Sequence, residues 1–174
     1  MSWADVWGTT PDETSLSFPC DRLIEGPDAV LFRGVTVQAT AGVLFRWLCQ
    51  LRVAPYSYDW IDNRGRQSPP QLTPGLDRLE IGQEVMTIFT LASFAHDQHL
   101  TLRIKPGPAS HLFGELACSY FIVPTQARRC RLLVKLVVRN PGGIAGALMR
   151  TFLPWGDLVM MRRQLLNLKA LAEG

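Results

Sequence analysis

The sequence contains no apolar run of about 18 residues, the length that a helix needs to cross a bilayer, so no transmembrane segment is expected. It also begins without a basic stretch followed by an apolar core, the pattern of a secretory signal. The chain of 174 residues has the length of one domain, and its apolar content of 47% is typical of globular proteins. These features make the cytoplasm the expected compartment.

Catalytic and metal-binding motifs are also missing. There is no glycine-rich phosphate loop, no nucleophile elbow and no His-Glu-x-x-His pair. His96, Asp97 and His99 lie together, but no third ligand follows at a metal-binding spacing. Aromatic and basic residues are not interleaved as they are in a nucleic-acid groove. We therefore predict no metal, no cofactor and no nucleic-acid partner.

Cysteine is scarce, and Cys20, Cys49, Cys118 and Cys130 form no C-x-x-C pair. A reducing compartment disfavours disulfides, and free cysteine in apolar surroundings behaves as a small core residue. Cys118 and Cys130 could face each other across a hairpin, but proximity alone does not make a bond. We expect free thiols.

Charge is distributed unevenly along the chain, although the net charge is only +3. Residues 1–30 hold six acids and one base, whereas residues 126–174 hold nine bases and two acids. A basic C-terminal third favours either an anionic partner or, more simply, a solvated strand and helix face.

The order of the predicted elements indicates one domain at residues 28–174, preceded by an acidic, irregular arm at residues 1–27 in which Trp3 and Trp7 are suited to docking. Pro and Gly punctuate a loop at 63–75. Within the domain we predict a strand at 29–39, a helix at 41–51 capped by Thr40, a short helix or turn at 55–63, and strands at 76–81, 83–95, 99–105, 111–123 and 128–139.

The last strands alternate between polar and apolar residues, which predicts an antiparallel meander with one wet face and one buried face. The predicted inward set is Leu100, Leu102, Ile104, Leu116, Cys118, Tyr120, Leu132, Val134 and Leu136. Both parities of 83–95 are apolar, so that strand is either covered twice or lies at a subunit interface. A homodimer is thus one of two alternatives.

The end of the chain, residues 154–173, predicts a long amphipathic helix with Leu158, Met161 and Leu165 on its apolar face. Asp157 falls in its first turn, where a carboxylate suits the helix dipole. A separate helical part, Gly142 to Phe152, precedes a kink at Pro154 and is placed to gate a pocket. Such a helix needs a broad apolar floor, which the meander supplies.

Three stretches of sequence carry a family resemblance. They read LRVAPYSYDWIDNRGRQSP, then LTPGLDRLEIGQEVM, and finally GDLVMMRRQLLNLKALAE. Over about residues 28–173 the chain resembles the SRPBCC superfamily of START-like and polyketide cyclase/dehydrase-like helix-grip proteins, in a bacterial subgroup of unassigned activity. The resemblance implies an α+β helix-grip fold, with two short helices after the first strand and a curved antiparallel sheet of six or seven strands around a long C-terminal helix. It also implies an internal cavity that mostly holds hydrophobic ligands.

The predicted function is the binding or carriage of a lipid, isoprenoid or polyketide-like molecule in that cavity. The candidate ligand-binding residues are Tyr58, Trp60, Leu102, Leu116, Cys118, Tyr120, Leu132, Val134, Leu158, Met161 and Leu165, joined by the compliant Met86, Met149 and Met160. The simpler interpretation is that these side chains fill an ordinary core.

Two other functions stay open. One is a cyclase/dehydrase-type enzyme with Tyr58, Asp62 or Tyr120 as acid or base, if burial shifts the pKa. Against it, Asp59, Asp62 and Asn63 are equally suited to capping a short helix. The other is a non-catalytic protein-interaction domain that uses the basic helix or the Trp-bearing arm.

Overall fold

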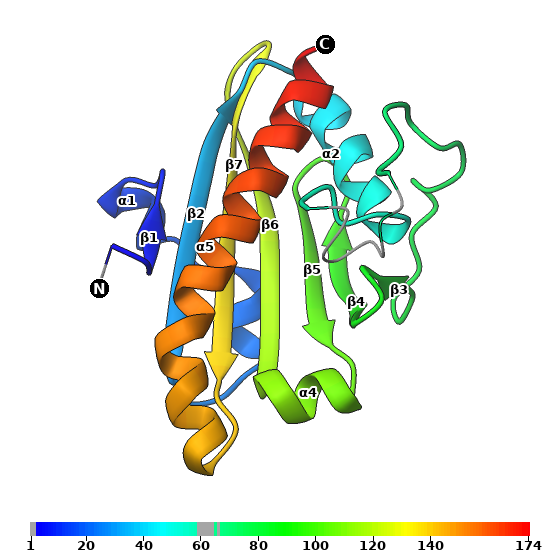
Figure 1. Cartoon of the computed structure of the whole chain (residues 1–174). Helices are drawn as coiled ribbons and strands as arrows, with labels where there is room; N and C mark the ends of the chain where they lie inside the picture. Colours follow the sequence, from blue (N-terminus) through cyan, green and yellow to red (C-terminus); the bar gives the residue numbers. More distant parts are fainter. Residues whose placement is uncertain (1–2, 59–64, 66) are drawn as a thin grey trace.

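The computed structural model describes residues 3–58, 65 and 67–174, and within them the strands form one seven-stranded sheet. The strands are β1 (Val6–Trp7), β2 (Ala29–Val37), β3 (Glu84–Val85), β4 (Phe89–Ala95), β5 (His99–Ile104), β6 (Glu115–Gln126) and β7 (Arg129–Arg139). The helices are α1 (Pro11–Thr14), η1 (Pro19–Arg22), α2 (Ala41–Cys49), η2 (Gln50–Arg52), α4 (Pro108–Phe113) and α5 (Gly143–Glu173). Helix α5 crosses one face of the curved sheet, and α2 lies beside its C-terminal half (Figure 1).

The sheet order is β1-β2-β7-β6-β5-β4-β3, so the first long strand pairs with the last one. From β2 to β3 every neighbouring pair is antiparallel, whereas β1 runs parallel to β2. The predicted meander and the long C-terminal helix are therefore confirmed, although the sheet as a whole is mixed.

One hydrophobic core lies between the sheet, α2 and α5. All nine side chains of the predicted inward set belong to it, together with Leu44 and Leu48 of α2 and Leu165 and Leu168 of α5. Thr40 caps α2 as predicted, because its hydroxyl accepts a hydrogen bond from the Val43 N–H at 3.3 Å. Alternation with a period of two thus placed these strands correctly.

The single strand predicted over 83–95 is wrong. Strands β3 and β4 are separated by a turn in which Met86 and Thr87 have φ values of 48° and 65°. Long-range bonds hold this turn: Met86 N–H donates to the Leu51 carbonyl at 3.1 Å, and Lys105 N–H donates to the Ile88 carbonyl at 2.8 Å. The apolar residues on both parities arise because Met86 and Ile88 leave the sheet and cover its inner face.

Two further strand predictions are corrected. Residues 76–81 form turns and irregular backbone, with no strand. His111 lies in helix α4, so β6 begins at Glu115 rather than at 111. Pro108 stands in the first turn of α4, where its missing N–H costs nothing, and Gly114, with φ of 80°, follows its last residue.

Helix α5 continues through Pro154, so the predicted division at that residue is wrong. The proline removes one backbone hydrogen bond, and the tertiary packing of the helix offsets that loss. Asp157 consequently lies near the middle of the helix, and its predicted role at the helix dipole is also wrong.

The N-terminal half of α5 is not amphipathic. Leu148, Phe152, Trp155 and Val159 recur at steps of three and four along one stripe of this half, and each is more than half exposed. The inner side of this half faces the sheet (Figure 1). Helix α5 is thus apolar on two sides here, and only its C-terminal half has the predicted pattern.

The N-terminal segment, predicted as an irregular arm, packs on the outer face of the sheet. Phe18, Cys20 and Ile24 form a second core cluster with outward residues of β2, β6 and β7, among them Leu133 and Val137. The outer face is therefore partly covered rather than wholly wet. Trp7 docks in β1, with the Arg162 guanidinium 5.6 Å from its ring, whereas Trp3 is 82% exposed.

Ion pairs explain the uneven charge along the sequence. Glu13 binds Arg131 through two contacts of 2.6 and 2.8 Å, and Asp21 lies 2.6 Å from Lys135. The N-terminal acids thus meet basic side chains of β7 on the outer face. The simpler of the two charge interpretations, a structural face, accounts for these residues.

All four cysteines lie among the described residues and are buried and free, as expected. Cys118 pairs with Leu136 in the sheet register and Cys130 with Pro124, so the two thiols do not oppose each other. In the part of the chain that the structure describes, no helix is both long enough and apolar enough to cross a membrane.

Candidate functional site

A cavity of about 460 Å³ lies between α5 and the inner face of the sheet. Its floor comes from β6 and β7, its long wall from α5, and its remaining sides from the β3–β4 turn, α4 and the segment after η2. The lining residues are Pro55, Ser57, Met86, Ile88, Phe89, Phe113, Leu116, Cys118, Tyr120, Leu136, Met149, Phe152, Leu153, Gly156, Asp157, Met160, Met161 and Gln164. Most of them are apolar.

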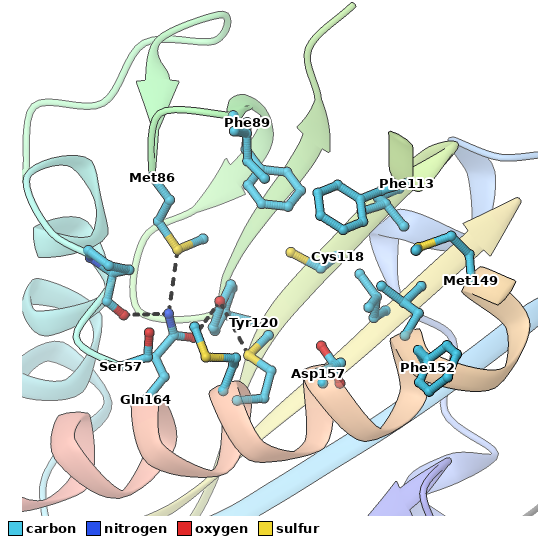
Figure 2. Close-up of a pocket in the computed structure, with 18 residues that line it drawn as sticks. Ser57, Met86, Phe89, Phe113, Cys118, Tyr120, Met149, Phe152, Asp157 and Gln164 are labelled. Atoms are coloured by element: carbon cyan, nitrogen blue, oxygen red, sulfur yellow. Dashed lines mark hydrogen bonds between the residues drawn. The ribbon is translucent and has the colours of Figure 1, made fainter. Parts of the chain in front are cut away.

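The apolar walls are unusually rich in methionine. Met86, Met149, Met160 and Met161, which are all the methionines among the described residues, line the cavity. Methionine side chains are flexible and polarisable, so a wall built from them adapts to different shapes. Phe152 lines the cavity and is 63% exposed, which places the mouth at this residue (Figure 2).

A hydrogen-bonded cluster occupies the opposite end of the cavity. The Tyr120 hydroxyl donates to Gln164 Oε1 at 2.6 Å, and Gln164 Nε2 donates to the Pro55 carbonyl at 2.6 Å (Figure 2). Tyr120 is fully buried and Gln164 is 4% exposed. Because both donors have partners, this end is held rigid by internal bonds.

Asp157 brings a carboxylate to the helix wall. Its Oδ2 lies 2.7 Å from Nη2 of Arg33, a residue of β2 that is 1% exposed. The Arg33 guanidinium also donates to the carbonyls of Ala4 and Asp5 in the segment before β1. The pair therefore joins the N-terminal segment, the sheet and α5 at the side of the cavity.

Burial changes the acidity of three lining groups. Desolvation raises the pKa of Asp157 from 3.8 to about 6, although the Arg33 charge opposes the shift. Desolvation also raises the pKa of Tyr120 well above its usual range, and the nearby Cys118 and Asp157 add to the effect. Burial likewise raises the pKa of the Cys118 thiol. Tyr120 and Cys118 are therefore neutral at pH 7, while most Asp157 is ionised.

The predicted ligand-binding residues fall into three groups. Leu116, Cys118, Tyr120 and Met161 line the cavity. The others that the structure describes are not among the lining residues: Leu102, Leu132, Val134 and Leu165 are buried in the core, and Tyr58 and Leu158 are half-buried. Trp60, together with Asp59, Asp62 and Asn63 of the predicted short helix, lies outside the described residues.

Polar residues of this site that escaped the sequence interpretation include Arg33, Asp157 and Gln164. Arg33 stands at an inward position of β2, where alternation predicts an apolar residue. Asp157 and Gln164 are seven residues apart, which puts them on the same side of a helix. That side also carries Met160, Met161 and Leu168, so polar residues within an apolar helix stripe were the available signal.

The chain matches no protein-family model and no curated protein. Solved structures do match it. A protein from Thermus thermophilus has a TM-score of 0.54 at 13% identity, over 83% of this chain and 97% of that one. The Zhui aromatase/cyclase from Streptomyces sp. R1128 has a TM-score of 0.52 at 16% identity, over 83% and 93%.

A third match is the di-domain ARO/CYC BexL of the BE-7585A biosynthetic pathway, with a TM-score of 0.52 at 15% identity. It covers 88% of this chain and 53% of BexL, as expected for a match to one of two domains. The chain has a helix-grip fold. Identities this low show the fold alone, and the fold that the sequence resemblance implied is thereby confirmed.

Proposed function

We propose that this protein binds a hydrophobic small molecule in the cavity beneath α5. The observation that supports this best is the cavity itself: about 460 Å³, mostly apolar, with a few inward polar groups. Small-molecule sites are typically concave and apolar, with a small number of polar groups that fix orientation. Lipids, isoprenoids and polyketide-like aromatics fit this description.

An ordinary core accounts poorly for such a space. Protein interiors pack as densely as organic crystals, so side chains normally close a gap of this size. Here the methionine and phenylalanine walls lack partner atoms on one side and forgo dispersion contacts. A bound apolar molecule would restore those contacts, which gives the cavity a physical reason to be filled.

Native mass spectrometry of the purified protein, followed by solvent extraction, tests this proposal. We expect a noncovalent mass increment and a hydrophobic compound in the extract. A protein that shows only its own mass, and that takes up no lipid, isoprenoid or aromatic compound from a panel added at saturation, would contradict it.

Acid–base chemistry of the cyclase/dehydrase type is a second candidate function. It is supported by Tyr120 and Asp157, a phenol and a carboxyl group with raised pKa values inside the cavity. Two structural neighbours carry the name aromatase or cyclase. Under this function Tyr120→Phe lowers turnover of a bound polyketide-like substrate at least tenfold and leaves its affinity within about twofold. Equal turnover of wild type and variant would rule out Tyr120 as the acid or base.

A further inference from the structure

Asp157 is the charged residue among the described residues that line the cavity. Its side chain is 10% exposed and lies on the α5 wall, between the Phe152 mouth and the Tyr120 end (Figure 2). A carboxylate offers about four lone-pair positions to donors. Contacts within the described part of the chain give Asp157 one partner, Arg33, so its acceptor capacity is only partly used.

The Arg33 guanidinium cannot turn toward a ligand, because backbone carbonyls hold it. Its Nη1 donates to Asp5 and Phe32, both at 2.9 Å, and its Nη2 donates to Ala4 at 2.8 Å. Arg33 is 1% exposed and is not a lining residue. A molecule in the cavity therefore meets the carboxylate of the pair and not the guanidinium.

The Tyr120–Gln164 cluster is less suited than Asp157 to hydrogen bonding with a ligand. The Tyr120 hydroxyl already donates to Gln164, and the Gln164 amide already donates to Pro55 and to the Met86 sulfur. Asp157 and Gln164 are seven residues apart on α5, or about 10 Å along the axis. The carboxylate thus marks a separate polar position, part of the way along an otherwise apolar wall.

We propose that Asp157 selects neutral, largely apolar ligands that carry a hydroxyl or N–H group, and that it binds this donor. The inference rests on the proposed function. A carboxylate ligand is disfavoured because two like charges would meet in a site with little water. A cationic ligand gains little, because Arg33 at 2.7 Å already balances the Asp157 charge and a second cation would leave a net charge buried.

Three probes with one ring system test this selectivity: naphthol, naphthalene and naphthoate, titrated calorimetrically into the whole protein at about pH 8, where carboxyl groups are ionised. We expect naphthol to bind about tenfold more tightly than naphthalene, since it adds a hydrogen bond to a charged acceptor. Naphthoate should bind at least tenfold more weakly than naphthalene. Equal affinities for the three overturn this inference alone, whereas failure of all three to bind overturns the proposed function with it.

Substitutions assign the selectivity to Asp157. Asp157→Asn keeps the shape and an oxygen for Arg33, so the fold is retained, and naphthoate affinity should rise at least tenfold. The double variant Arg33→Met, Asp157→Leu removes both charges, and naphthol and naphthalene should then bind equally. Asp12→Asn, at an exposed position of α1, is the control and should match wild type. A naphthol preference that survives in the double variant overturns the inference.

Discussion

At the scale of single residues, the central feature is a pair of opposite charges taken out of water beside the cavity. Burying an ion pair costs desolvation energy that the attraction of the two charges only partly returns. Arg33 recovers more of its desolvation energy than Asp157 does, because its guanidinium donates hydrogen bonds to the backbone carbonyls of Ala4, Asp5, Phe32 and Pro154. Asp157 has no comparable set of described donors. The effect of desolvation on its pKa therefore exceeds the opposing effect of the Arg33 charge, and the pKa rises to about 6.

This raised pKa predicts a pH dependence of stability. Because the folded pKa of Asp157 exceeds the value of 3.8 for the unfolded chain, its contribution is present at low pH and is lost as the pH rises through about 6. Relative to Asp157→Asn, the wild type should lose about 2 kcal/mol of unfolding free energy between about pH 4.5 and about pH 7.5. Urea denaturation of both proteins across that range measures the difference. Carboxyl groups present in both, such as Glu13, cancel; a constant difference would show that Asp157 is not perturbed.

At the scale of elements, ion pairs of very different geometry join the first 28 residues to the rest of the chain. Glu13 and Arg131 form a two-contact pair with side chains less than a fifth exposed, whereas Asp28 and Arg150 are 3.9 Å apart and more exposed. Two-contact arginine–carboxylate pairs are strong, and exposed single contacts contribute little.

Double-mutant cycles separate these two cases. For Glu13→Gln with Arg131→Met we expect a coupling energy of about 1–2 kcal/mol toward stability. For the control cycle, Asp28→Asn with Arg150→Met, we expect less than about 0.5 kcal/mol. Chemical denaturation gives both values. Equal coupling in the two cycles would mean that the N-terminal segment is not fixed through Arg131.

Local pattern predicts some elements well and others poorly. Strands β5 to β7 alternate regularly over long stretches, so their inward faces followed from the sequence. The Met86–Thr87 turn did not follow from the sequence, because long-range hydrogen bonds of Met86 with Leu51 and of Ile88 with Lys105 help to hold it. The strand predicted at 111–123 includes the last three residues of α4, because a helix of six residues is too short for a helical period to show.

At the scale of the whole molecule, the N-terminal segment and the domain share a core. Phe18 is 3% exposed and packs edge-to-face with Phe32 and Phe121, and the Lys135 ammonium lies 5.3 Å from its ring centroid. Sequence could not show this, because the acidic, Pro- and Gly-rich composition of residues 1–27 resembles that of a loose arm. The structure explains acids of this segment, such as Glu13 and Asp21, by their ion pairs with basic residues of β7.

Phe18→Ala tests this shared core. We expect a loss of about 3 kcal/mol of unfolding free energy, since a buried aromatic ring is removed, within a single cooperative transition. Trp3→Ala, at a side chain that is 82% exposed, should change stability by less than about 0.5 kcal/mol. If Phe18→Ala is equally neutral, the segment does not stabilise the domain.

The candidate site was also predictable only in part, because contacts between residues distant in sequence leave no local pattern. Parity and helical spacing brought out Leu116, Cys118, Tyr120 and Met161, which all line the cavity. These patterns could not separate residues that line the cavity from residues that fill the core. Leu102 and Leu165 lie on the same faces as the lining residues but are packed in the core. The partner of Asp157 is 124 positions away in sequence, at Arg33, and no local pattern links the two.

Filling the cavity without disturbing the fold tests the central claim most directly. Gly156 lines the cavity on α5, and a Cβ at this position would meet no atom within 4 Å. Gly156→Phe therefore adds a ring at the cavity wall without a clash at its Cβ, and it also replaces a poor helix former. Ala170→Phe, at an exposed position of the same helix, is the matched control.

The measurement is a titration of N-phenylnaphthylamine, an apolar dye that fluoresces when it leaves water, into the three proteins. We predict saturable binding to wild type and Ala170→Phe, and at least tenfold weaker binding to Gly156→Phe, whose thermal stability is at least that of wild type. Equal dye affinity for all three proteins, or no saturable binding to the wild type, would contradict a ligand site beneath α5.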